Sequence, residues 1–185
     1  MRVVQAINNT LHKLMSEYKD LIIIGEDILD PYGGAFKATK GLSTIYPKRV
    51  ITTPVSEESL IGFASGLAMQ KKPVIVEIMF GDFLGLAFDQ IINHISKFIW
   101  MFKDVSIPLI IRTPMGGGRG YGPTHSQSIE KHFCGISGLN VIAIDQFMNI
   151  EKIYLNSIKS QKPVLLIENK ILYGRELKKD FKFPN

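Results

Sequence analysis

The sequence predicts an α/β fold: an open, mainly parallel six-stranded sheet with helices on both faces. Short apolar runs alternate with longer amphipathic segments along the whole chain. The runs are rich in Val, Ile and Leu, and several show hardly any polar alternation. This is typical of strands buried on both faces of a covered parallel sheet. Alternation of strands with helices also implies right-handed crossovers between parallel strands.

The strands are predicted where the apolar runs are most compact. They cover residues 21–24, 49–52, 73–78, 107–112, 140–144 and 163–168. The helices are predicted at residues 3–17, 56–70, 82–102 and 149–160. In the first helix an apolar stripe recurs with helical spacing at Val4, Ile7, Leu11 and Leu14.

The second predicted helix has the clearest start. Ser56 is a suitable cap, and Glu57 and Glu58 place negative charge at the positive end of the helix dipole. Small residues follow and allow the helix to approach the sheet closely. The third predicted helix is long and apolar, and aromatic side chains gather near its end at Phe98, Trp100 and Phe102. Core packing or a partner interface would explain them equally well.

The composition indicates one globular domain of 185 residues with 45% hydrophobic and 21% charged residues. We expect residues 1–174 to form it and 175–185 to be a solvated basic tail. One cysteine, Cys134, excludes an internal disulfide. The net charge of +5 is scattered rather than striped, which argues against nucleic acid. No apolar run reaches the ~20 residues of a membrane span, and no signal peptide is evident, so a cytoplasmic location is expected.

Unusual segments follow three consecutive predicted strands. Residues 53–57 follow the second strand, 79–83 follow the third, and 115–127 follow the fourth. Ligands bind at the carboxyl ends of strands in open parallel sheets. The sequence therefore predicts a site along that edge.

The glycine-rich segment at 116–127 holds five glycines within seven positions, followed by Thr124, His125, Ser126 and Gln127. Its spacing matches neither a dinucleotide-binding fingerprint nor a phosphate P-loop. A surface turn would explain the glycines alone, but the polar run behind them favours a functional loop. His125 is the best placed of four histidines, and no cysteine or histidine spacing indicates zinc.

Six motifs occur in one order along the chain. They are Gly25-Glu26-Asp27, Thr53-Pro54-Val55-Ser56-Glu57, Val76-Glu77-Ile78, Phe88-Asp89-Gln90-Ile91-Ile92-Asn93, Gly120-Tyr121-Gly122-Pro123-Thr124-His125-Ser126-Gln127 and Leu172-Tyr173-Gly174. Together they resemble the β subunit of the thiamine-diphosphate-dependent 2-oxo-acid dehydrogenases of the pyruvate, branched-chain and acetoin types. The resemblance covers residues 3–174 and implies the transketolase-like, pyrimidine-binding domain.

The resemblance implies a role for each of five residues. Glu57 matches the glutamate that hydrogen-bonds a pyrimidine nitrogen of thiamine diphosphate, so that the cofactor's own imino group can act as a base. Phe83 matches the aromatic residue that packs on the pyrimidine, and Val55 matches an apolar contact beside it. Met79 stands where relatives often have glutamine. His125 matches a histidine that assists the substrate and the later acyl transfer.

The resemblance also implies partners, because the chain lacks the Gly-Asp-Gly and asparagine pattern that holds diphosphate and magnesium. An α subunit is expected to carry the diphosphate and Mg²⁺. A lipoyl-bearing acyltransferase component would receive the acyl group made from a 2-oxo acid. The 82–102 segment is the candidate interface. No metal site is carried over, including the potassium site of some relatives.

Several alternatives stay open. The family's carboxyl-terminal domain is absent, so the chain is either a fragment or a separate subunit. A transketolase-like or sugar-synthase half would share this domain, and a truncated, non-catalytic interaction module would share the short length. Glu57 and Glu58 could simply compensate the helix dipole. Arg119 interrupts the glycine run and either binds an anion or points to solvent.

Overall fold

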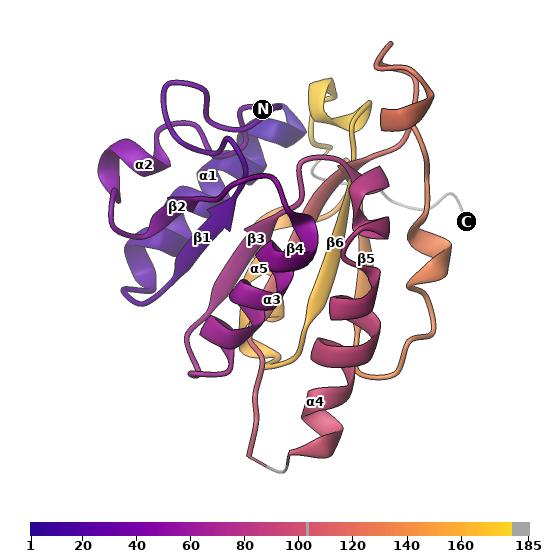
Figure 1. Ribbon diagram of the computed structural model, residues 1–185. Helices are drawn as coiled ribbons and strands as arrows, with labels where there is room; N and C mark the ends of the chain where they lie inside the picture. Colours follow the sequence, from indigo (N-terminus) through magenta and orange to yellow (C-terminus); the bar gives the residue numbers. More distant parts are fainter. Residues whose placement is uncertain (103, 179–185) are drawn as a thin grey trace, which may run out of the picture.

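The computed structural model describes residues 1–102 and 104–178. Six parallel strands form one sheet in the order β2-β1-β3-β4-β6-β5 (Figure 1). The strands are β1 Ile22–Gly25, β2 Val50–Thr52, β3 Val74–Glu77, β4 Leu109–Met115, β5 Asn140–Ile144 and β6 Val164–Asn169. All six predicted strands are present, so the predicted fold class is confirmed.

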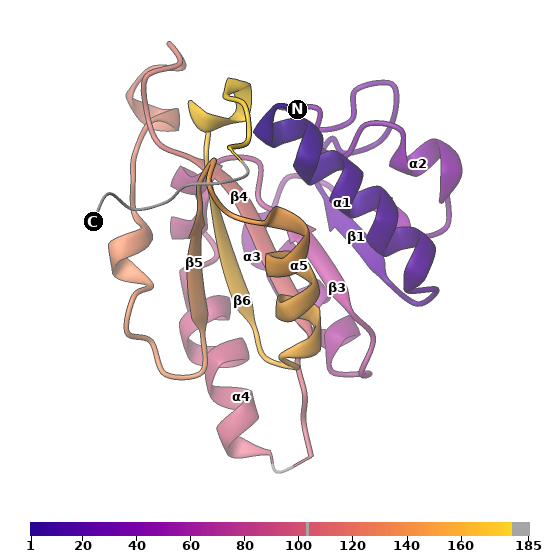
Figure 2. The ribbon, with the colours of Figure 1, turned by 180° about the vertical axis from the view of Figure 1, so that it is seen from behind.

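Helices cover both faces of the sheet and explain why the strands are so apolar. On one face lie α1 (Val3–Glu17) and α5 (Ile150–Lys159); on the other lie α3 (Glu57–Ala68) and the helical segments that lead into α4 (Ser96–Met101) (Figures 1 and 2). Every residue of β3 and β4 is buried. Each face has its own apolar core, which accounts for the lack of polar alternation in the strands.

The segment predicted as one helix over 82–102 is instead divided into three helical types. A 3₁₀ helix covers Gly81–Gly85, a π-helix covers Gln90–Ile95, and α4 follows. A Cβ on Gly81 would lie 2.6 Å from the Met115 side chain, so the segment starts pressed against the end of β4. Apolar spacing alone does not separate these helical types, since each keeps the apolar residues on one side.

The two ends of the described chain lie side by side. The Val3 N–H donates to the Arg175 carbonyl at 2.9 Å, and the Leu177 N–H donates to the Met1 carbonyl at 3.0 Å. The start of the predicted tail is therefore bound to the beginning of α1 through its backbone. Residues 179–185 lie outside the described residues, so the rest of that tail stays a prediction.

No helix in residues 1–102 or 104–178 has both the length and the apolar character to cross a membrane.

The strand order contains a reversal that decides where a ligand can enter. The chain passes from β1 outward to β2, and then crosses β1 to reach β3 on its other side. Helices therefore leave the carboxyl ends of β1 and β3 in opposite directions. A crevice at such a reversal is where open α/β sheets bind ligands. In Figure 1 this edge of the sheet faces upward.

Candidate functional site

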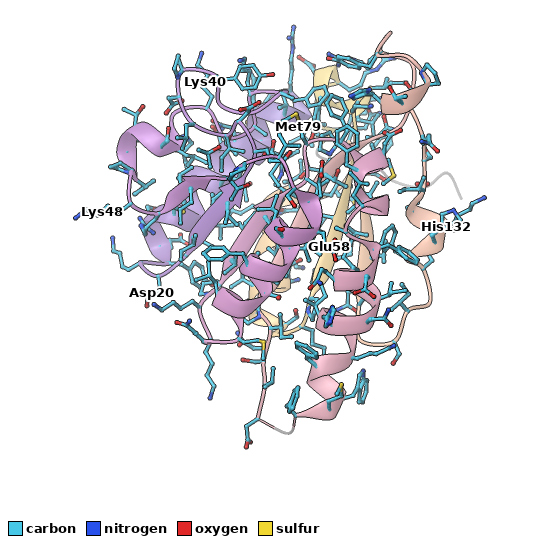
Figure 3. All side chains as sticks on the ribbon, viewed as in Figure 1. Asp20, Lys40, Lys48, Glu58, Met79 and His132 are labelled. Carbon is cyan, nitrogen blue, oxygen red and sulfur yellow. The ribbon has the colours of Figure 1, made fainter. Side chains whose placement is uncertain are left out.

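The predicted site residues follow three strands, β2, β3 and β4, at the carboxyl edge of the sheet. Glu57 is the first residue of α3, after β2, while Met79 and Phe83 follow β3 and His125 follows β4. Met79, labelled in Figure 3, lies near the upper edge and is half-buried. Val55 is 77% exposed and projects its apolar side chain outward at this edge.

Glu57 lies with a second buried carboxyl group, Glu26, which follows β1. The two side chains are 4% and 3% exposed. The Ser56 N–H donates to Glu26 Oε1 at 3.1 Å and fixes that carboxyl at the start of α3. Burial raises the pKa of Glu26, and the negative charge of Glu57 raises it further. The negative charge of Glu57 therefore disfavours ionisation of the buried Glu26 carboxyl.

The two adjacent glutamates at the start of α3, Glu57 and Glu58, have different surroundings. Ser56 occupies the cap position, but its hydroxyl pairs with Ser59 Oγ at 2.9 Å and makes no cap hydrogen bond. The predicted capping role of its side chain is therefore wrong. Glu58, labelled in Figure 3, is exposed on α3, whereas Glu57 is buried. This agrees with Glu57 rather than Glu58 facing a ligand.

Aromatic rings form the second part of the site. The His125 ring lies edge-on to Phe80, with centroids 4.6 Å apart, and to Phe83, with centroids 5.3 Å apart. Tyr121 and Phe36 extend the cluster, since each packs within 6 Å of the Phe80 ring. Phe83 is half-buried, so part of its ring can contact a ligand.

The glycine-rich loop carries His125 to this place. Gly116, Gly118, Gly120 and Gly122 all have φ between 77° and 94°, a region that other residues rarely adopt. Four left-handed positions in seven residues explain why the sequence is so rich in glycine here. The loop is closed where the Gly116 N–H donates to the Gln127 carbonyl at 3.2 Å.

Arg119 uses part of its guanidinium group to contact the protein itself. Its Nη1 donates to the Lys170 carbonyl at 3.1 Å, and its guanidinium lies 5.9 Å from the centre of the Phe36 ring. The side chain therefore ties the glycine-rich loop to the segment after β6.

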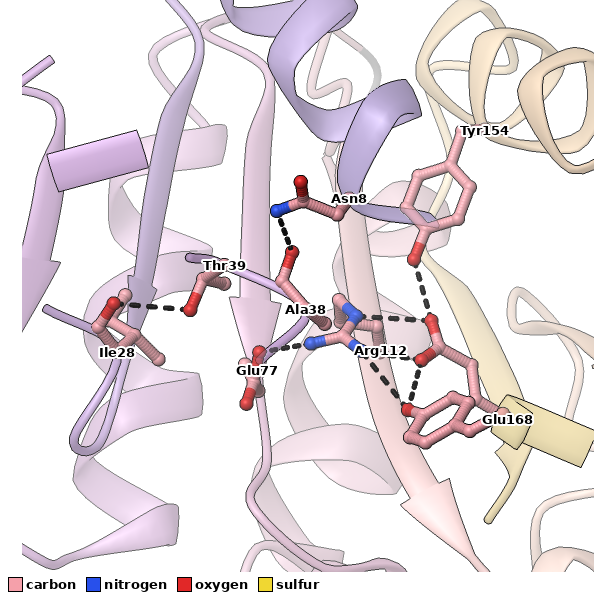
Figure 4. A network of polar contacts seen from close by, with 9 residues as sticks. Asn8, Ile28, Ala38, Thr39, Glu77, Arg112, Tyr154 and Glu168 are labelled. Carbon is pink, nitrogen blue, oxygen red and sulfur yellow. Dashed lines mark hydrogen bonds and ion pairs between the residues drawn. The ribbon is translucent and has the colours of Figure 1, made fainter. Parts of the chain in front are cut away.

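A buried charge network lies below the site, within the sheet (Figure 4). Arg112 on β4 donates to Glu168 on β6 and to Glu77 at the end of β3. Although burial opposes its charge, Glu168 and Glu77 keep the pKa of Arg112 well above its usual value. Tyr154 and Tyr173 both donate to Glu168. The network holds three adjacent strands together just beneath the site.

Sequence reasoning missed two residues of this site. Glu26 stood in a recognised motif but received no role, although a carboxyl group directly after an apolar strand was a usable signal. Lys170 is likewise a charged residue directly after an apolar strand, β6, and it is completely buried in the fold. Phe83 and His125 are brought into contact as predicted, whereas Glu57 lies with Glu26 at the neighbouring strand end.

The site carries groups that could contact a flat, nitrogen-containing ring. A buried carboxyl group can hydrogen-bond a ring nitrogen, Phe83 offers a ring face, and Val55 offers exposed apolar surface. Among the described residues no group of three or more His, Cys, Asp or Glu side chains is placed to hold a metal ion.

Comparison with known proteins places these features in a family. The model of the transketolase pyrimidine-binding domain matches residues 1–176. The pyruvate dehydrogenase E1 component subunit beta of Staurastrum punctulatum is 36% identical over 176 residues, covering 94% of this chain and 53% of that protein. The acetoin:2,6-dichlorophenolindophenol oxidoreductase subunit beta of Cupriavidus necator is 35% identical over 181 residues, covering 92% and 54%.

Two further proteins extend the comparison. The mitochondrial 2-oxoisovalerate dehydrogenase subunit beta 2 of Arabidopsis thaliana is 36% identical over 176 residues, covering 94% of this chain and 49% of that protein. A solved structure, a split-gene transketolase described as an inactive beta4 tetramer, superposes with a TM-score of 0.73 at 18% identity, covering 98% and 54%. The chain thus spans about half the length of the relatives it matches.

Proposed function

The chain belongs to the transketolase pyrimidine-binding domain family, and on that premise we propose that it is the pyrimidine-binding part of a heteromeric 2-oxo-acid dehydrogenase. Its relatives that are 35–36% identical carry the names of dehydrogenase or acetoin oxidoreductase β subunits. The observation that carries the proposal is the buried carboxyl pair, Glu26 and Glu57, at the same edge of the sheet as the contact between Phe83 and His125.

The cofactor in this proposal is thiamine diphosphate, which when bound would supply the carbon nucleophile that attacks and decarboxylates a 2-oxo acid. Glu57 would hydrogen-bond a nitrogen of the pyrimidine ring and hold a proton there. Its burial makes that hydrogen bond strong, because water cannot compete for it. Glu26 lies beside Glu57, whose negative charge favours the protonated form of Glu26.

The remaining residues would orient the pyrimidine and the substrate. Phe83 would pack on the ring, with Val55 and Met79 as apolar neighbours. His125 would donate a hydrogen bond or a proton to the reacting substrate, because it is half-buried at the mouth of the site. Its Nδ1 lies 2.8 Å from Thr124 Oγ1, which orients the ring and leaves Nε2 for the substrate.

A partner subunit is part of the proposal. It would supply the diphosphate and Mg²⁺ ligands, and a lipoyl-bearing acyltransferase would accept the acyl group. The face formed by α3, the 3₁₀ helix and α4 exposes the large apolar side chains Phe63, Leu86, Trp100, Met101 and Phe102. Apolar side chains this exposed are typical of an interface. This face includes the 82–102 segment that was predicted as the interface, and it also includes α3.

Reconstitution tests the proposal. The chain would be mixed with an α subunit from the same source, and decarboxylation of pyruvate and of branched 2-oxo acids would be followed with and without thiamine diphosphate and Mg²⁺. We expect turnover only when both are present. Turnover of a sugar-phosphate donor instead would identify a transketolase-like half. Formation of the complex without turnover of either substrate class would identify a non-catalytic module.

A further inference from the structure

The glycine-rich loop that carries His125 lies along the segment that follows β6. The Lys170 N–H donates to the Met115 carbonyl at 3.0 Å, just where the loop begins. A Cβ on Gly118 would lie 2.8 Å from Ile171 Cδ1, so the loop backbone is in close contact with that side chain. The position of the loop therefore depends on residues 170 and 171.

Lys170 is unusual because it is a charged side chain with no exposed surface. Its Nζ donates to the carbonyl of His125. The ammonium also lies 5.0 Å from the centre of the Phe80 ring and 5.5 Å from that of Tyr121. A buried cation is costly unless such groups compensate it.

Burial lowers the pKa of Lys170, whereas the negative charge of Asp82 opposes that effect. Asp82 also contacts the loop, because its Oδ1 accepts a hydrogen bond from the Gln127 N–H at 3.0 Å. The cation and the carboxylate therefore both hold the carboxyl-terminal end of the same loop, one at His125 and one at Gln127.

The attachment is reciprocal. Lys170 donates to a carbonyl of the loop, and Arg119 of the loop donates to the carbonyl of Lys170 at 3.1 Å. Lys170 thus binds the backbone near the end of the loop, and Arg119 binds the backbone of Lys170 itself. We call this pair of contacts the Lys170–Arg119 clasp. It joins the loop after β4 to the segment after β6, at the edge where His125 meets Phe80 and Phe83.

We propose that Lys170 is a positioning residue that holds the His125 ring against Phe80 and Phe83 through this clasp. Neither Lys170 nor Arg119 needs to touch the substrate in this role. The effect of Lys170 on catalysis rests on the function proposed above for His125. The positioning of the His125 ring by Lys170 does not rest on that function. Without the clasp, the glycine-rich backbone is free to leave the edge of the site, because glycine restricts it least.

The test is NMR of the full chain with its histidines labelled at Cε1, for the wild type and for Lys170→Met. The chain has four histidines, so the other three serve as internal controls. In the wild type the edge-on rings of Phe80 and Phe83 displace the His125 Hε1 signal. In Lys170→Met we expect that signal alone to move toward its value in the unfolded chain.

Amide exchange gives a second readout. In Lys170→Met the backbone amides within residues 117–127 should exchange about tenfold faster. This is the change in exchange rate expected when one hydrogen bond to a charged group is lost. Strand amides should keep their rates. The matched control is Lys48→Met, which removes an exposed lysine far from the site (Figure 3) and should change neither readout.

An unmoved His125 signal with unchanged loop exchange in Lys170→Met would overturn the positioning role. If Lys170→Met does not fold, Arg119→Gln replaces it, because Arg119 is exposed and its loss removes only the second contact. Faster exchange in Arg119→Gln supports the clasp, and unchanged exchange refutes it. Absence of turnover by the reconstituted wild-type complex would instead refute the proposed function and leave these readouts interpretable.

Discussion

Glu26 and Glu57 are buried side by side at the ends of two adjacent strands, and the charge of Glu57 raises the pKa of Glu26. They come from different segments, one directly after β1 and one at the start of α3. The Ser56 N–H, which donates to Glu26, connects the two segments. A ligand nitrogen placed here would therefore meet two carboxyl groups in a region from which most water is excluded.

Glu57→Gln should nearly abolish activity of the reconstituted enzyme. The amide cannot hold a proton at the pyrimidine nitrogen, so exchange of the thiazolium C–H into D₂O should slow by about 10²-fold or more. The exchange rate is measured by NMR after acid quench. Glu58→Gln, one residue further and exposed, is the matched control and should exchange at the wild-type rate. Equal rates in wild type and Glu57→Gln would remove Glu57 from its assigned role.

Glu26→Gln should change how the stability of the chain depends on pH. The folded pKa of Glu26 lies above its ordinary value of 4.5, so folding favours the protonated form. As pH rises above 4.5, the unfolded chain loses this proton first and the wild type loses stability. Glu26→Gln has no such proton to lose, so the stability of the variant relative to the wild type should increase from pH 5 to pH 8. Urea unfolding at both pH values measures this, and an identical difference at both would contradict it.

His125→Ala should impair substrate steps more than cofactor binding. The ring lies at the mouth of the site and packs on Phe83, so its loss removes a donor for the substrate and leaves Glu57 in place. We expect kcat for the 2-oxo acid to fall by about 10²-fold. The affinity for thiamine diphosphate, measured by calorimetry on the complex, should change little. His132→Ala, at an exposed position, is the control. A large loss of cofactor affinity with kcat preserved would assign His125 to the cofactor instead.

Arg112→Met should destabilise the fold strongly. It leaves Glu77 and Glu168 buried without their cation, a change that costs about 3–5 kcal/mol of unfolding free energy. Tyr154→Phe removes only one hydrogen bond to Glu168 and should cost about 1 kcal/mol. Urea unfolding of both variants at neutral pH measures the difference. Similar losses in the two variants would mean that Arg112 does not hold the network together.

The sequence was sufficient for the strands and for the edge where the site lies. The run 21–24 is apolar throughout and the run 73–78 is apolar except for Glu77, and strands covered on both faces bury such runs. The same patterns could not show that residues 82–102 divide into three helical types. The division depends on packing against the end of β4. The patterns also could not show that the Ser56 side chain makes no cap hydrogen bond, because that depends on the position of Ser59.

What the sequence determined by itself is the order of strands and helices, and with it the side of the sheet on which Glu57, Phe83 and His125 emerge. What only the tertiary structure decided is which side chains share surroundings: Glu57 with Glu26, and His125 with Lys170. The physical reason is that apolar periodicity is local, whereas the pairing of buried charges depends on which strand ends become neighbours. The sheet order decides which strands lie beside β1 and β4. This order cannot be read from the order of the strands along the chain.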